Sequence, residues 1–200
     1  MKHQAESSGE FRRVSSHEKG YSVAAVDSFF TRLADDYELM LSGAELGKDI
    51  HTSRTVREAI FEGESGGYDP QDVDAALDKV EDRFCELEKQ LYLQRYGQHT
   101  WDQAVQELRE LLLGRLERPA GERFRRPAKK LTKGYFTAEV DALCDRLFAH
   151  MEGADVLAPA DIRAAAFSPA TGDLSYEETQ VDAFLDRAIE YLNDTAASSI

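Results

Sequence analysis

The sequence has few of the residues that mark disulfide-rich, membrane-spanning or nucleic-acid-binding proteins. Its 200 residues include 2 cysteines, 5 prolines and 1 tryptophan. No apolar run approaches the roughly 18 residues of a membrane span, and residues 1–10 lack the apolar core of a secretory signal. We therefore expect Cys85 and Cys144 to be reduced, buried thiols in the cytoplasm. The formal net charge of −14 argues against nucleic acid as a partner.

The sequence also lacks any recognisable catalytic or metal-binding arrangement. The glycine-rich segment 63–67 has no following Lys-Ser/Thr and carries Glu64, which would repel a phosphate, so we predict a turn there. Acidic residues are spread along the predicted helices, as on a solvated surface. The histidines are isolated from one another: His3, His17, His51, His99 and His150. We predict no catalytic residue, no metal site and no cofactor, and hence no enzyme.

One pattern occurs four times. A tyrosine is followed five residues later by a Val-Asp pair, and a basic residue follows five residues after the aspartate. Because aspartate and base are not one helical turn apart, we expect each aspartate to bridge to another copy. Catalytic residues are seldom repeated in this way, so we assign the recurring residues to packing between copies. They are Tyr21, Val26, Tyr68, Val73, Leu77, Tyr135, Val140, Tyr176, Val181 and Leu185.

The spacing of apolar residues predicts a helix after each of these tyrosines. Between Val73 and Leu91 the spacing alternates between four and three, which places the residues on one helical stripe. Asp69 is the expected N-cap of this helix, with Pro70 at its first position. The other predicted starts and stops are an N-cap at Ser22, a stop at Ser42-Gly43, a short helix opened by Thr55 and reaching Phe61, its echo over 161–167, a break at Gly97, and a helix over 100–117 capped by Thr100.

Two longer similarities predict an internal duplication. Phe124-Arg125-Arg126 echoes Phe11-Arg12-Arg13, and Lys133-Gly134-Tyr135 echoes Lys19-Gly20-Tyr21. We predict an all-α, internally duplicated repeat protein whose amphipathic helices follow Gly-Tyr turns and pack in coiled-coil-like pairs. The predicted parts are a disordered tail at 1–10, a first half at 11–117, a basic linker at 118–133, a second half at 134–195 and a frayed end at 196–200.

The segment 115–133 differs from the rest of the chain in charge. Eight basic residues stand against two acidic ones there, which gives a local charge of +6. An apolar residue among cations suits contact with an anionic membrane or a partner. The alternative is a linker that neutralises acidic helices of its own chain. The contact residues on the first interpretation are Arg123, Phe124, Arg125, Arg126, Lys129 and Lys130.

The repeated pattern resembles the DivIVA-type domain of Gram-positive bacteria. The likeness is closest over 56–84 and covers about two-thirds of the chain. As a whole, the chain looks like the short actinobacterial proteins with tandem DivIVA-like domains. The family's Phe-Arg before Gly-Tyr, which enters the bilayer, is absent from all four copies, where Glu18-Lys19, Ser65-Gly66, Thr132-Lys133 and Asp173-Leu174 stand instead.

The resemblance implies a non-enzymatic cytoplasmic scaffold, enriched at the septum or cell pole, that recruits cell-division or cell-wall-growth proteins. Because the family domain is a dimer, we predict that neighbouring copies pair within this chain and imitate that dimer. A homodimer of the whole chain stays open. The alternative function is a peripheral membrane-binding protein that acts through segment 115–133.

Overall fold

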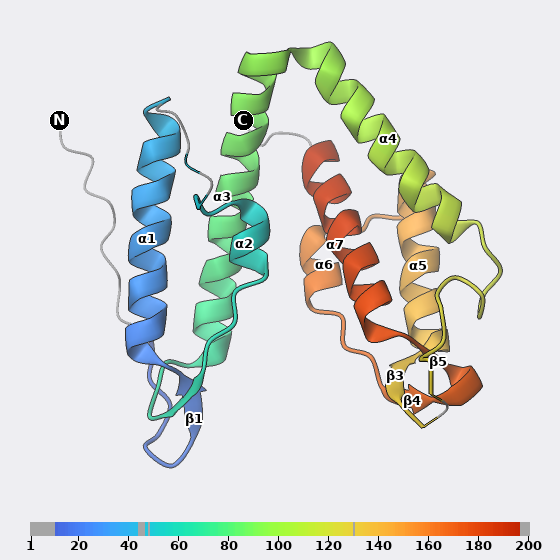
Figure 1. Cartoon of the computed structure of the whole chain (residues 1–200), viewed down its shortest axis with the longest axis horizontal. Helices are drawn as coiled ribbons and strands as arrows, with labels where there is room; N and C mark the ends of the chain where they lie inside the picture. The colour runs from blue at the N-terminus through green and yellow to red at the C-terminus, as the bar shows by residue number, and fades with distance from the viewer. Residues whose placement is uncertain (1–10, 44–46, 48, 130, 197–200) are drawn as a thin grey trace. The chain divides into compact units, whose positions relative to one another are not determined.

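The computed structural model of the chain is mostly helical, with small antiparallel sheets (Figure 1). It describes residues 11–43, 47, 49–129 and 131–196, so the predicted tails at 1–10 and 197–200 lie outside the described residues. The helical class predicted from the apolar spacing is confirmed. The chain divides into two compact units, Met1–Gln94 (unit 1) and Arg95–Ile200 (unit 2).

Unit 1 is built from two long helices, a short helix and a small sheet. Tyr21 and Tyr68 lie opposite each other and exchange both backbone hydrogen bonds, with N···O distances of 2.8 and 2.9 Å. Strand β1, which contains Tyr21, also pairs antiparallel with β2, with Gly20 opposite Glu64. The elements are β1 (Lys19–Tyr21), α1 (Val23–Leu41), α2 (Ser53–Arg57), β2 (Gly63–Ser65) and α3 (Pro70–Tyr96).

Local side-chain chemistry sets most helix starts in unit 1. Asp69 Oδ1 accepts a hydrogen bond from the Gln71 N–H at 3.0 Å, as expected for a cap before Pro70. Ser22 makes no capping hydrogen bond, and the first free N–H of α1, on Val23, donates to Glu64 of β2 at 3.0 Å instead. The prediction for Thr55 was wrong, because Thr52 caps α2 and the helix ends at Arg57.

The core of unit 1 joins α1, α2 and α3. Leu33 and Met40 of α1 pack with Phe84 and Leu87 of α3, and Val56 of α2 closes the cluster. A second cluster lies beside the sheet, where Val26, Tyr68 and Val73 are buried. The stripe predicted for α3 therefore faces inward. Burial of these side chains stabilises the unit by about 2 kcal/mol for each large residue.

Unit 2 contains four helices and a three-stranded sheet within the described residues. Its strand order is β4-β3-β5, and Tyr135 of β3 lies opposite Tyr176 of β5. The elements are α4 (Gln98–Leu116), β3 (Lys133–Phe136), α5 (Thr137–Met151), α6 (Pro159–Arg163), β4 (Pro169–Thr171), the 3-10 turn η1 (Gly172–Leu174), β5 (Ser175–Tyr176) and α7 (Glu178–Thr195).

Several boundaries differ from the prediction. Helix α4 was assigned to the first half, but Leu112 and Leu116 are buried in the core of unit 2. Its N-cap is Gly97 and not Thr100. Segment 118–133 is no free linker, because Phe124 belongs to the same core. Helix α6 spans Pro159–Arg163, so the helix predicted over 161–167 was placed too late in the chain.

The sheets were not predicted, and glycine makes their close approach feasible. A Cβ placed on Gly20 would lie 2.2 Å from the Tyr68 carbonyl oxygen, and one on Gly134 would lie 2.1 Å from the Tyr176 carbonyl oxygen. The glycine before these tyrosines is therefore required by the neighbouring strand. In the fourth copy Ser175 takes this place. The segment 63–67, predicted as a turn, contains strand β2.

Candidate functional site

The tyrosines and aspartates of the recurring pattern pair crosswise in unit 2. The Tyr176 hydroxyl, before α7, donates to Asp141 of α5 at 3.0 Å. Tyr135, before α5, is hydrogen-bonded in turn to Asp182 of α7. Each tyrosine therefore holds the helix that follows the opposite tyrosine. Burial, together with the neighbouring carboxylate, raises the pKa of Tyr135 and of Tyr176 to about 12.

Unit 1 contains the same crosswise arrangement. The Tyr68 hydroxyl, before α3, donates to Asp27 of α1 at 3.1 Å. Tyr21, before α1, is hydrogen-bonded to Asp74 of α3, and its pKa is raised by burial and by that carboxylate. We call these four contacts the tyrosine–aspartate pairs. The expectation that each aspartate reaches another copy fits this geometry, but the partner from that copy is a tyrosine and not the base of the pattern.

A phenylalanine ring packs at a tilt against the first tyrosine of each unit. The rings of Tyr21 and Phe61 lie 5.3 Å apart at 49°. Those of Tyr135 and Phe167 lie 5.1 Å apart at 48°. Each phenylalanine lies four residues after the end of a short helix, α2 or α6, so the likeness between 56–61 and 161–167 reflects both a matching short helix and this ring contact.

The two Phe-Arg-Arg segments, residues 11–13 and 124–126, also make matching contacts. The ring of Phe11 packs edge-on against Tyr68, and that of Phe124 packs edge-on against Tyr176, with centroid distances of 5.3 and 5.1 Å. The last arginine lies over the same tyrosine ring in both units, with guanidinium-to-centroid distances of 5.9 Å for Arg13 and Tyr68 and 5.2 Å for Arg126 and Tyr176.

The middle arginine of each segment forms an ion pair with the acid that follows the tyrosine. Arg12 pairs with Asp69, and its backbone carbonyl accepts the Asp69 N–H at 2.7 Å. Arg125 pairs with Glu177 at 2.9 Å, and its carbonyl accepts the Glu177 N–H at 2.8 Å. The segments are therefore fastened to the turn before α3 and before α7.

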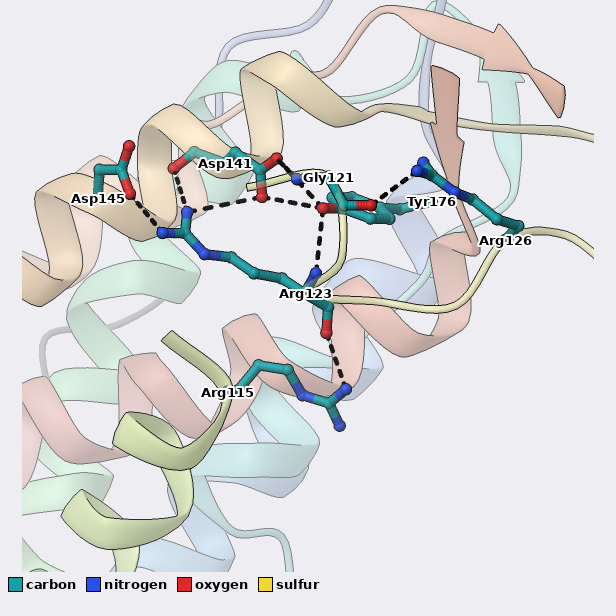
Figure 2. Close-up of polar contacts among 7 residues, drawn as sticks. All are labelled: Arg115, Gly121, Arg123, Arg126, Asp141, Asp145 and Tyr176. Atoms are coloured by element: carbon teal, nitrogen blue, oxygen red, sulfur yellow. Dashed lines mark hydrogen bonds and ion pairs between the residues drawn. The ribbon is translucent and has the colours of Figure 1, made fainter. Parts of the chain in front are cut away.

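A buried polar network distinguishes unit 2 (Figure 2). The Asp141 carboxylate accepts the Tyr176 hydroxyl and also the Gly121 N–H at 2.7 Å. Arg123 is 7 % exposed; it donates to the Asp141 carbonyl at 2.9 Å and to the Asp145 carboxylate at 2.5 Å. These contacts fasten the segment after α4 to helix α5.

The residues predicted to contact a membrane or partner are divided by the fold. Phe124 is 5 % exposed and Arg123 is buried, so neither is presented at the surface. Arg125 and Arg126 are exposed but make the contacts described above. Lys129 is exposed, and Lys130 lies outside the described residues. The apolar side chain at the surface of this segment is Leu131, which is 90 % exposed.

The residues predicted to pack lie where packing requires them. Val26, Val73, Val140 and Val181 have no exposed surface. Tyr68 and Tyr176 are buried, whereas the remaining four are half-buried against the same clusters: Tyr21, Leu77, Tyr135 and Leu185. Two bases of the pattern pair with an acid close by in the chain: Arg187 with Glu190 of its own helix at 2.6 Å, and Arg146 with Asp155 at 3.5 Å.

Sequence reasoning missed a buried ion pair in unit 1. Arg57 of α2 donates to Glu81 of α3 at 2.8 Å, and their side chains are 12 % and 2 % exposed. Glu81 sits next to Val80 of the predicted stripe, in a run of charged residues that resembles an ordinary surface. Only the buried position of Glu81 against α2 reveals the pair, so no sequence signal could have found it.

The cysteines and acids offer little for catalysis. Burial raises the pKa of the Cys85 thiol to about 11 and that of Cys144 to about 12, so little thiolate forms at neutral pH.

Within the described residues no group of three or more His, Cys, Asp or Glu side chains is arranged to hold a metal ion. None of the described helices has both the length and the apolar character needed to cross a bilayer.

Comparison with protein-family models, with curated proteins and with solved structures finds no match for this chain.

Proposed function

We propose that the chain is a non-enzymatic scaffold in which each unit imitates a dimer within one polypeptide. The observation that carries this proposal is the recurrence of the tyrosine–aspartate pairs in both units. In a symmetric dimer every contact from one subunit to the other is returned, and here the tyrosine before each helix binds the aspartate of the opposite helix. Internal duplication of a dimer-forming module accounts for this reciprocity.

The duplication also accounts for the contacts of the Phe-Arg-Arg segments. Phe11 and Phe124 each pack on the second tyrosine of their own unit, and the ion pairs of Arg12 and Arg125 occupy matching positions. All these residues are engaged within their unit, and they stabilise it without forming a reactive group. Because the repeated residues are used for packing, we propose that the protein acts by binding other proteins through its surface.

The resemblance to DivIVA-type domains supplies the proposed setting. The partners are then cell-division or cell-wall-growth proteins, and the protein acts in the cytoplasm at the septum or pole. A fluorescent fusion expressed in the native cell tests this: enrichment at septum or pole supports the proposal, and uniform fluorescence contradicts it. Affinity purification from the same cells should recover proteins of division or wall growth.

The imitation of a dimer has its own test. Sedimentation velocity at several protein concentrations should give a compact monomer or a compact dimer, because the two copies within each unit already pair with each other through the tyrosine–aspartate pairs. Extended oligomers that grow with concentration, without a compact species, would contradict the internal pairing even if the cellular location were correct.

One observation favours the alternative function of membrane-surface binding. Leu131 is 90 % exposed and lies between the exposed Lys129 and Lys133, which together suit an anionic bilayer. Flotation with anionic liposomes at low salt tests it. Co-flotation that is lost in Leu131→Ser but kept in Ile60→Ser, an equally exposed site outside the basic segment, would support membrane binding. Absence of co-flotation in the native protein would end this alternative.

A further inference from the structure

The segment that follows α1 in unit 1, and the one that follows α5 in unit 2, each return to that helix through a backbone hydrogen bond. In unit 1 the His51 N–H donates to the Asp36 carboxylate of α1 at 2.9 Å. In unit 2 the Leu157 N–H donates to Nδ1 of His150, in the last turn of α5, at 3.1 Å. Each donor lies two residues before the short helix of its unit, α2 or α6, so the two hydrogen bonds make the same connection.

The two acceptors also occupy matching positions. Asp36 lies nine residues after Asp27, and His150 lies nine residues after Asp141, where Asp27 and Asp141 are the aspartates of the recurring pattern. A carboxylate therefore accepts the hydrogen bond in unit 1 and an imidazole accepts it in unit 2. Of these two groups, only the imidazole changes its charge between about pH 5 and 8.

The direction of the hydrogen bond in unit 2 requires a neutral His150. A ring nitrogen accepts a hydrogen bond only when it carries no proton, so the proton of the neutral ring is on Nε2. A second proton would bind Nδ1, and the Leu157 N–H would then lose its acceptor. Leu157 is 3 % exposed and packs in the core of unit 2, where an N–H without an acceptor is costly.

The matching contact in unit 1 responds to a proton in the opposite sense. Nδ1 of His51 lies 2.5 Å from the Asp36 oxygen that also accepts the His51 N–H, and the ring packs edge-on against Phe29. A proton on this ring adds a positive charge beside the carboxylate and strengthens the contact. Burial raises the pKa of Asp36, but the hydrogen bonds from His51 and the charges of His51 and Arg32 outweigh burial and hold that pKa below its ordinary value.

The charged residues on the elements around the two histidines form contacts of their own. In unit 1 Glu88 of α3 accepts the N–H and the hydroxyl of Ser53, at 2.8 and 2.6 Å. In unit 2 the charged residues of α4, α5, α6 and the segment between α5 and α6 form ion pairs or accept backbone N–H groups. These contacts are Arg109 with Glu152, Arg146 with Asp155, and Asp161 with the Ala158 N–H.

We infer that the two contacts form a pH-sensitive switch that works in opposite senses in the two units. As the pH falls from about 8 to about 5, unit 2 releases Leu157 from His150, whereas unit 1 holds His51 more tightly to Asp36. The release brings the buried Leu157 toward the surface beside Val156, which is already 82 % exposed. Acid therefore creates an apolar surface after α5. The inference does not depend on the proposed function, since it rests on contacts within each unit.

Amide exchange of the ¹⁵N-labelled full chain, measured at about pH 7.5 and about pH 5.5, tests the switch. The protection factor, which is the intrinsic exchange rate at each pH divided by the measured rate, reports the opening of a single hydrogen bond. For Leu157 it should fall roughly tenfold or more at the lower pH, because its buried N–H loses the acceptor. For His51 it should stay the same or rise.

His150→Asn separates the proton from the hydrogen bond. The asparagine side-chain oxygen can accept the Leu157 N–H in place of Nδ1, but it does not titrate. The Leu157 protection factor should therefore be the same at both pH values in this variant. His99→Asn, which replaces an exposed histidine of α4, is the matched control and should keep the wild-type response.

The ¹⁵N chemical shifts of the His150 ring supply a second measurement that needs no variant. Nδ1 should carry no proton at the higher pH and should gain one at the lower pH. A wild-type Leu157 protection factor that is independent of pH would overturn the switch. So would an equal fall in His150→Asn, a fall in the His51 protection factor as large as that of Leu157, or a proton on Nδ1 of His150 at the higher pH.

Discussion

Removal of the Tyr176 hydroxyl should destabilise unit 2 far more than removal of the Tyr68 hydroxyl destabilises unit 1. Tyr176 and Asp141 are 0 % and 6 % exposed, and the hydroxyl also accepts the Arg123 N–H at 3.2 Å. In Tyr176→Phe a buried carboxylate loses a donor and a buried N–H loses its acceptor. At about 1–3 kcal/mol for each unsatisfied group, the expected loss is about 3 kcal/mol.

The matched variant Tyr68→Phe should cost about 1 kcal/mol or less. The Tyr68 hydroxyl donates to Asp27, which is exposed, so water can replace the lost donor. The two substitutions remove the same group from matching positions. The sites differ in the burial of the acceptor and in the buried Arg123 N–H that is bonded to Tyr176, so the contrast between them measures the cost of leaving buried polar groups without a partner.

Urea unfolding measures both effects. The single tryptophan, Trp101, lies in unit 2, so its fluorescence follows that unit, while circular dichroism follows both. With a slope of about 2 kcal/mol per M, a loss of 3 kcal/mol lowers the fluorescence midpoint by about 1.5 M. A midpoint shift in Tyr176→Phe no larger than that caused by Tyr68→Phe would refute the reasoning from burial.

Three further variants or conditions test other parts of the fold. Glu81→Gln should cost unit 1 about 3 kcal/mol, because it removes the charge that pairs with the buried Arg57. Glu58→Gln, which removes the exposed pair with Arg54, should cost at most about 0.5 kcal/mol. Equal urea midpoints of the two variants by circular dichroism would contradict this. Gly134→Ala should cost about 3 kcal/mol by fluorescence, because its Cβ would overlap the strand opposite, and a native-like midpoint would be inconsistent with that approach. Unit 2 should lose stability between pH 10 and 12, because the fold raises the Tyr135 pKa from 10.0 to about 12 and so favours the neutral phenol. This contribution to stability is fully present below pH 10. A fluorescence midpoint that does not change with pH between 10 and 12 would argue against this prediction.

The long helices could be predicted because their signals are local. Alternating spacings of four and three marked α3, and Asp69 followed by Pro70 marked its start. Short elements were predicted less well. Helix α2 has five residues and was placed two residues too late, and strands of two to four residues are too short for alternation to be recognised.

The packing role assigned to the recurring residues fits their positions, but the contacts themselves could not be predicted. Recurrence indicated that Tyr176 and Asp141 belong to the scaffold. The distance between them in the chain, 35 residues, leaves the partner unspecified. Phe124 shows the opposite failure: cations on both sides suggested a surface position, whereas its ring packs against Tyr176 and Phe184. Flanking charge therefore did not predict burial.

The sequence by itself determined the helical class, the fourfold pattern and the residues that pack, because periodicity and recurrence are properties of the chain alone. The tertiary structure decided which copy each tyrosine binds, that α4 belongs to unit 2, and that Arg57 and Glu81 form a buried pair. These depend on which surfaces meet. Contacts between residues far apart in the chain are chosen by the total burial and hydrogen bonding of the fold, and no local pattern carries that information.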